Sequence, residues 1–205
     1  MMSQASLVEE KRGAKVAGKE KSEQMACMRR RLPEVLTNLR VLLRNKKPAD
    51  AVVDIVAHVE REKLFPEAHY AFEAGLLTPR LTRFIEDTGK HWVSELNGSC
   101  HIQWEGPWRP LERVAEDLRR ESSLSFRSFP VRSLNEETKT FHAFTRSVRL
   151  DHYGRKRIVI VHEQANLKDA PYFLFTDALY WEGSRILETW LYRWQEKLFQ
   201  EFFSS

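Results

Sequence analysis

Residues 140–162 read TFHAFTRSVRL, DHYG and RKRIVIVH, two strand-length stretches separated by four turn-forming residues. In the first stretch, alternate positions would lie on one side of a strand, and these positions are occupied by Phe144, Arg146, Val148 and Leu150. The second contains the longest uninterrupted apolar run of the chain, Ile158 to Val161. A period of two is typical of a strand, and a short turn between two such stretches predicts a β-hairpin.

The segments around this hairpin predict a mixed α/β architecture. Tyr172 to Thr176 is strand-like, and residues 97–177 are mainly β with one helix near residues 110–120. Residues 50–96 alternate helix, strand, helix and strand, and this alternation predicts a parallel sheet flanked by helices. In the second of these helices Thr78 is a candidate N-cap and Pro79 occupies the first helical position.

Both ends of the chain have separate signals. Apolar spacing predicts a helix over residues 32–44 and a long final helix from about Gly183 to Phe203. Residues 1–32 are polar and aperiodic, which predicts a poorly ordered segment. Residues 1–47 contain twelve Lys and Arg against five Glu, although the whole chain carries only +4. The basic run Arg29 to Arg31 is either a solvated tail or an arm that contacts phosphates.

Composition excludes several classes of protein. No stretch approaches the roughly 20 apolar residues of a membrane-spanning helix, so no membrane partner is expected. The two cysteines, Cys27 and Cys100, form no CxxC pattern, and the histidines have no zinc-site spacing. Gly-rich phosphate loops are absent. We therefore expect a cytoplasmic protein without a disulfide framework, a dedicated zinc site or nucleotide-driven chemistry.

Stretches spread over residues 70–203 resemble bacterial insertion-sequence transposases of the DDE type. The resemblance rests on FEAG at 72–75 with LTP at 77–79, GKHWVSEL at 89–96, FTRSVRL at 144–150, RIVI at 157–160, FLFTD at 173–177 and ILETWLYRW at 186–194. Their order and spacing carry it more than any single stretch does. The resemblance implies a ribonuclease H-like domain with a β insertion.

The resemblance also implies three acidic residues that hold two Mg²⁺ or Mn²⁺ ions for phosphoryl transfer. The second acid aligns with Glu73, where the family has Asp, and the first acid position falls on Ala5. The third position aligns with Lys197, and a one-residue deletion would place Glu196 there instead. At about 100° per residue, Glu196 lies opposite the apolar stripe of the final helix and Lys197 lies on its flank. Because an ammonium group cannot ligate a metal ion, we expect a defective catalytic site.

The same resemblance implies a DNA partner, namely the double-stranded ends of a transposon. Candidate phosphate contacts are Arg146, Arg149, Arg155, Lys156, Arg157 and Arg193. Trp92, Trp104 and Trp108 are candidates for stacking on an unpaired base, although ordinary packing is the alternative for each. A second copy of the chain or an intact transposase is a further candidate partner.

The residue patterns predict an α/β fold, and the resemblance implies that it is an incomplete ribonuclease H-like fold in three parts. These are a basic segment (1–32), a partial core (33–96 and 178–205) and a β-rich insertion (97–177). The expected function is that of a DDE transposase-family protein in DNA transposition, defective in metal-dependent cleavage and strand transfer. The alternatives are a non-catalytic DNA-binding or transposase-interacting regulator, and a decayed reading frame without a selected function.

Overall fold

The computed structural model describes residues 48–132 and 138–191, and the chain divides into two compact units, residues 1–66 and residues 67–205. The described part of the first unit, residues 48–66, contains α2 (Pro48–Arg61). The helix predicted from Asp50 is thus confirmed, but it begins two residues earlier, because proline is well suited to the first helical turn. The predicted segment 1–32 and the predicted helix over residues 32–44 lie outside the described residues.

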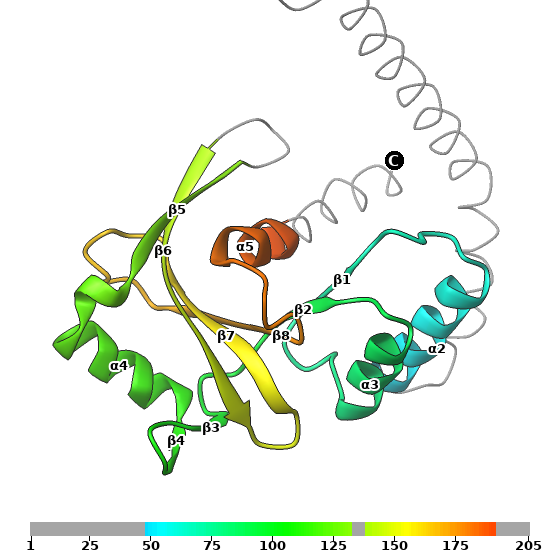
Figure 1. Cartoon of the computed structure of the whole chain (residues 1–205), viewed down its shortest axis with the longest axis horizontal. Coiled ribbons are helices and arrows are strands. Elements are labelled where there is room, and N and C mark those ends of the chain that lie inside the picture. The colour runs from blue at the N-terminus through cyan, green and yellow to red at the C-terminus, as the bar shows by residue number, and fades with distance from the viewer. Residues whose placement is uncertain (1–47, 133–137, 192–205) are drawn as a thin grey trace, which may run out of the picture. The chain divides into compact units, whose positions relative to one another are not determined.

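The second unit is built on one mixed sheet of eight described strands (Figure 1). Seven strands follow one another in the order β1-β2-β8-β7-β6-β3-β4, and β5 also pairs with β6. The strands are β1 (Tyr70–Phe72), β2 (Trp92–Glu95), β3 (His101–Gln103), β4 (Trp108–Pro110), β5 (Arg127–Arg132), β6 (Thr138–Leu150), β7 (Gly154–His162) and β8 (Tyr172–Thr176). The helices of this unit are α3 (Pro79–Asp87), α4 (Leu111–Glu121) and α5 (Gly183–Leu191), with a short 3₁₀ turn at Ser123–Ser125. The fold class is therefore mixed α/β, as predicted.

The predicted hairpin is confirmed by β6 and β7. They pair antiparallel from His142 opposite His162 to Leu150 opposite Gly154. Gly154 closes the turn with φ at +71°, a left-handed conformation that glycine adopts without steric cost. The strand predicted at Tyr172–Thr176 is also confirmed, as β8.

The alternating segment before the hairpin forms one parallel unit, as predicted. Strands β1 and β2 pair in parallel, with Phe72 opposite Ser94, and α3 connects them. Thr78 caps α3, because its Oγ1 accepts a hydrogen bond from the backbone N–H of Leu81 at 3.2 Å, and Pro79 begins the helix. The helix predicted near residues 110–120 is confirmed as α4. Only the first part of the long final helix, α5, lies within the described residues.

Strands from the predicted partial core and from the predicted β insertion lie side by side in this sheet. Strand β8 lies between β2 and β7 and pairs antiparallel with both. The strands within residues 97–177 therefore extend the same sheet that β1 and β2 begin.

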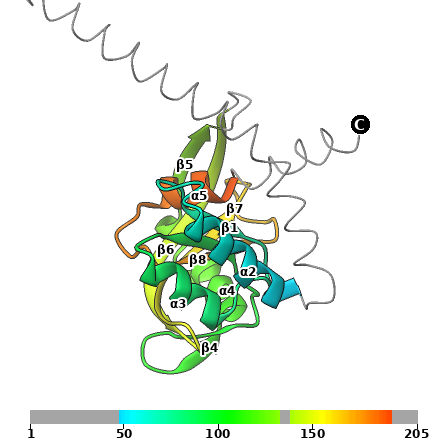
Figure 2. The same ribbon diagram turned by 90° about the vertical axis from the view of Figure 1, so that its right-hand side faces the viewer.

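Opposite faces of this sheet have different covers (Figure 2). On the first, which we call the α5 face, Val93, Val159 and Leu174 form one buried cluster with Trp181, Leu187 and Trp190 of the following loop and α5. On the second, the α3 face, Trp92 and Lys156 contact Glu86 of α3. Because neighbouring residues of a strand point to opposite faces, this division also decides where each basic side chain of the hairpin lies.

Candidate nucleic-acid interface

A row of polar and aromatic side chains crosses four adjacent strands on the α5 face, beyond the residues that α5 covers. The pairing places Trp108 of β4 opposite Gln103 of β3, Gln103 opposite Arg149 of β6, and Arg149 opposite Arg155 of β7. Residues that lie opposite one another across strands share a face of the sheet. We call Trp108, Gln103, Arg149 and Arg155 the basic row.

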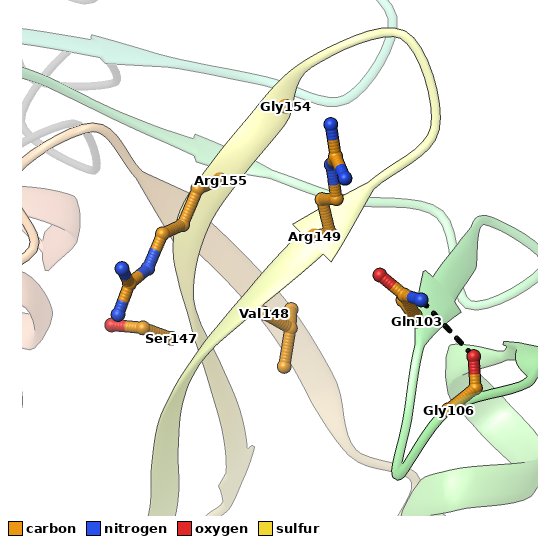
Figure 3. A pocket seen from close by; sticks show the side chains of 7 residues that line it. All are labelled: Gln103, Gly106, Ser147, Val148, Arg149, Gly154 and Arg155. Atoms are coloured by element: carbon orange, nitrogen blue, oxygen red, sulfur yellow. Dashed lines mark hydrogen bonds between the residues drawn. The ribbon is translucent and has the colours of Figure 1, made fainter.

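The middle of the basic row borders a surface cavity of about 570 Å³. The cavity is lined by Gln103, Arg149 and Arg155 together with Ser147, Val148 and the turn residues Gly106 and Gly154. In Figure 3 the two guanidinium groups point in different directions, and that of Arg155 lies beside the side chain of Ser147. The Gln103 Nε2 group donates a hydrogen bond to the carbonyl oxygen of Gly106 at 3.1 Å, which orients its amide.

Arg149 and Arg155 form a like-charged cross-strand pair. Both side chains are exposed, and within residues 48–132 and 138–191 neither makes an ion pair with a carboxylate. Like charges directly opposite one another on a sheet are destabilising. A bound anion would relieve this repulsion, and guanidinium groups are well suited to phosphate because they donate two parallel hydrogen bonds.

The remaining predicted basic residues of the hairpin are engaged elsewhere. Arg146 lies on the α3 face, where its guanidinium carbon is 4.3 Å from the centre of the Trp104 ring and its Nη1 is 3.6 Å from a Glu105 carboxylate oxygen. Lys156 lies on the same face, is 8% exposed, and has its Nζ 3.1 Å from Glu86 Oε1. These two side chains are therefore separated by the sheet from the basic row.

Arg157 lies on the α5 face, but it acts as an internal brace. Its Nη1 donates to the carbonyl oxygen of Leu179 and its Nη2 donates to Thr145 Oγ1, each at 3.0 Å. The loop after β8 is thereby fixed to the hairpin. Of the six predicted phosphate contacts, the structure brings together Arg149 and Arg155, whereas Arg193 lies outside the described residues.

The three tryptophans have different environments. Trp92 has no exposed surface, and its ring packs against Phe175 and donates to Glu86 Oε1 at 3.1 Å. Stacking of a base on Trp92 is therefore incompatible with this arrangement, and packing is its role. Trp104 is 7% exposed beneath Arg146, whereas Trp108 is 50% exposed at the end of the basic row. Trp108 is the tryptophan that a base can reach.

Of the predicted acid positions, only that of Glu73 lies within the described residues. Glu73 is exposed directly after β1, and its backbone carbonyl accepts a hydrogen bond from Ser94 Oγ at 3.5 Å. Ala5, Glu196 and Lys197 lie outside the described residues. Among the described residues no group of three His, Cys, Asp or Glu side chains could hold a metal ion. The donor set of this part of the chain therefore does not match a three-acid metal centre around Glu73.

Two members of the cavity lining, Gln103 and Ser147, were not predicted. Ser147 is two residues from Arg149, so strand alternation places both on one face. That signal was available in the sequence. Gln103 reaches the site only through the pairing of β3 with β6, which has no local signal.

Comparisons with known proteins leave the family open. No protein-family model matches the chain, and no curated protein is significantly similar to it in sequence. In the described part of the chain, every helix is too short or too polar to cross a membrane.

Proposed function

We propose that the chain is a DDE transposase-family protein of DNA transposition that binds duplex DNA and has lost metal-dependent cleavage and strand transfer. The family assignment rests on the stretches between residues 70 and 203 that resemble insertion-sequence transposases. The proposal for DNA binding rests on one observation above all, the like-charged pair Arg149 and Arg155 beside the cavity.

The chemistry of the basic row supports a phosphate-bearing ligand. Two guanidinium groups, the Ser147 hydroxyl and the Gln103 amide all offer hydrogen-bond donors to phosphate oxygens. Contacts of this kind position a duplex without reading its sequence. Trp108 adds an exposed ring at the end of the row, where the last base of a DNA end has a stacking surface.

A metal ion would contribute through Glu73. If Mg²⁺ or Mn²⁺ were bound, it would activate an attacking hydroxyl and stabilise the departing oxygen. Glu73 is the one member of the predicted set that lies within the described residues, and Lys197 occupies the aligned third position in the sequence. We assign no step to a metal ion for this reason.

The alternative is a regulator that occupies transposon ends or pairs with an intact transposase, and the basic row supports it equally well. The two roles differ in their effect on an active enzyme. A regulator inhibits end cleavage by an intact transposase in proportion to its own occupancy of the DNA, whereas a decayed reading frame has no such effect. We propose a cytoplasmic location for either role.

The test of DNA binding is a salt titration of affinity for labelled duplexes, one with transposon-end sequence and one random. We expect Arg149→Glu with Arg155→Glu to abolish binding at moderate salt. We expect Arg149→Gln with Arg155→Gln to reduce the slope of log K against log salt by about 2, one for each lost phosphate contact. Arg113→Gln is the matched control, because Arg113 is an exposed arginine that pairs with Glu116 on α4.

Two outcomes would overturn the proposal. Unchanged affinity in both double variants would remove the basic row from the interface. Robust Mg²⁺-dependent cleavage of end DNA by the purified protein, lost in Glu73→Ala, would show that the metal centre is intact.

A further inference from the structure

A second polar cluster joins the residue before β2 to the loop between β8 and α5. It takes no part in the proposed DNA binding. His91 Nδ1 lies 2.6 Å from Asp177 Oδ2, and His91 Nε2 lies 2.5 Å from the hydroxyl oxygen of Tyr180. The other oxygen of Asp177, Oδ1, accepts a hydrogen bond from the backbone N–H of Trp92 at 3.0 Å. The three side chains therefore form one continuous chain of hydrogen bonds.

The direction of these hydrogen bonds follows from their chemistry. An ionised carboxylate only accepts, so His91 must donate from Nδ1 to Asp177. In the neutral imidazole Nε2 is then an acceptor, and Tyr180 donates its hydroxyl proton to it. A hydroxyl next to a base that a third group orients is the arrangement of an activated nucleophile.

Exposure varies along the chain of hydrogen bonds as a nucleophilic site requires. The Asp177 side chain is 10% exposed, that of His91 is 22% exposed, and Tyr180 is 73% exposed. The orienting acid is covered, and the reacting hydroxyl is accessible to solvent.

The surroundings of the cluster are cationic. The ring of Trp181 lies 5.3 Å from the His91 ring and 4.9 Å from the His69 ring, centre to centre, and the Arg185 guanidinium stacks on Trp181 at 4.3 Å. Burial lowers the pKa of His69, and the charges of Arg185 and Lys90, with that of His91 whenever it is protonated, lower it further, against the opposing charge of Asp177. Positive charge beside an exposed nucleophile favours an anionic substrate.

We infer that Tyr180 is a nucleophile that accepts the phosphoryl group of a phosphate ester, with His91 as its general base and Asp177 as a positioning residue. The phenol oxygen forms a bond to phosphorus while the bond from phosphorus to the leaving alcohol breaks. The phenol proton passes to His91 Nε2 and then to the departing oxygen. The product is a phosphotyrosyl ester, and the step uses neither a metal ion nor the acids of the proposed transposase site.

The experiment uses the full chain, bis(4-nitrophenyl) phosphate and a chelator. We expect a burst of one equivalent of 4-nitrophenolate and an adduct that peptide mass spectrometry places on Tyr180. Tyr180→Phe abolishes the burst, and His91→Gln slows it by about 100-fold, which is the usual contribution of a general base. The matched controls are Tyr172→Phe, which removes another exposed tyrosine, and His101→Gln, which removes another exposed histidine.

Asp177→Asn distinguishes positioning from mere support of the fold. Asparagine retains an oxygen for the Trp92 N–H, so we expect the variant to remain folded by circular dichroism while its burst rate falls at least tenfold. The inference is overturned if Tyr180 is modified no faster than Tyr172, or if His91→Gln reacts at the wild-type rate while remaining folded by circular dichroism. DNA binding by the basic row is unaffected by either result.

Discussion

Two His–Asp pairs of the same sheet unit have nearly the same geometry and different settings. In one pair His91 Nδ1 meets Asp177, and in the other His162 Nδ1 lies 3.1 Å from Asp169 Oδ1. Each aspartate also accepts a backbone N–H, from Trp92 and from Glu163 respectively. The His162 side chain is 2% exposed and its ring packs edge-on against Phe126, whereas His91 is 22% exposed and continues to Tyr180.

A hydrogen bond between a histidine and an aspartate is therefore not enough to identify a reactive site. His162 and Asp169 are seven residues apart and close the loop between β7 and β8. His91 and Asp177 are 86 residues apart, and their chain of hydrogen bonds ends at an exposed hydroxyl. The third partner and its access to solvent separate a site from a structural clip.

The largest expected effect is a loss of stability in the more buried of the two pairs, His162 and Asp169. His162→Ala leaves a cavity and deprives Asp169 of a partner, so we expect a loss of about 2–4 kcal/mol in the free energy of unfolding. His91→Ala is expected to cost about 1–2 kcal/mol, because its side chain is less buried. Urea denaturation followed by tryptophan fluorescence measures both. Equal losses would show that the two pairs are both structural clips.

The next effect concerns acid stability. Partial burial raises the pKa of Asp169, but the Glu163 N–H and His162 outweigh it and hold that pKa below its usual value. A depressed folded pKa stabilises the protein above the unfolded pKa, and this stability is lost as the pH falls through the folded value. Asp169→Asn should cost about 1–2 kcal/mol at neutral pH and remove this part of the acid dependence. Urea denaturation between pH 7 and about pH 3 tests both expectations. If the stability of the variant fell with pH as steeply as that of the wild type, the expected change in acid dependence would be contradicted.

A smaller effect is expected at the exposed end of the other pair. Tyr180→Phe should change the free energy of unfolding by less than about 0.5 kcal/mol, as is usual for an exposed side chain. A loss as large as that of His91→Ala would mean that the hydroxyl is structural. The measurement therefore tests the difference between the two His–Asp pairs without the use of a phosphate ester.

The smallest effect is electrostatic. Arg185→Gln removes one of the positive charges that lower the pKa of His69, so that pKa should rise towards its usual value while remaining below it because of burial. An NMR titration of the imidazole resonances measures the change, with Arg113→Gln as a distant control. A fall in the pKa of His69 would contradict the cationic setting of this cluster.

Local features of the fold were predictable from the sequence. The Thr78–Pro79 start of α3, the turn at Asp151–Gly154 and the strand Tyr172–Thr176 depend on neighbouring residues, and all are found where the sequence placed them. The position of β8 between β2 and β7 was not predictable, because that pairing joins distant segments. The sequence therefore did not indicate that the segments on either side of residue 97 share one sheet.

The candidate site was predictable only in part. Arg149 and Arg155 were recognised from charge, but Arg146 was grouped with them although it is three residues from Arg149, an odd spacing that puts it on the other face of a strand. Burial of Trp92 followed from packing of α3 that no motif records. His91, Asp177 and Tyr180 were not singled out as a site, because nothing in the sequence brings them together.

The pairing of β2 has a consequence for folding during synthesis. The hairpin of β6 and β7 can form as soon as β7 leaves the ribosome, because its partners are close in the chain. Strand β2 completes its pairing only with β8, and the contact of Trp92 with Asp177 spans 85 residues. The apolar surface around Trp92 and Val93 is therefore exposed for most of the translation time of this unit. Exposed apolar surface of this kind favours aggregation of the nascent chain until β8 has been synthesised.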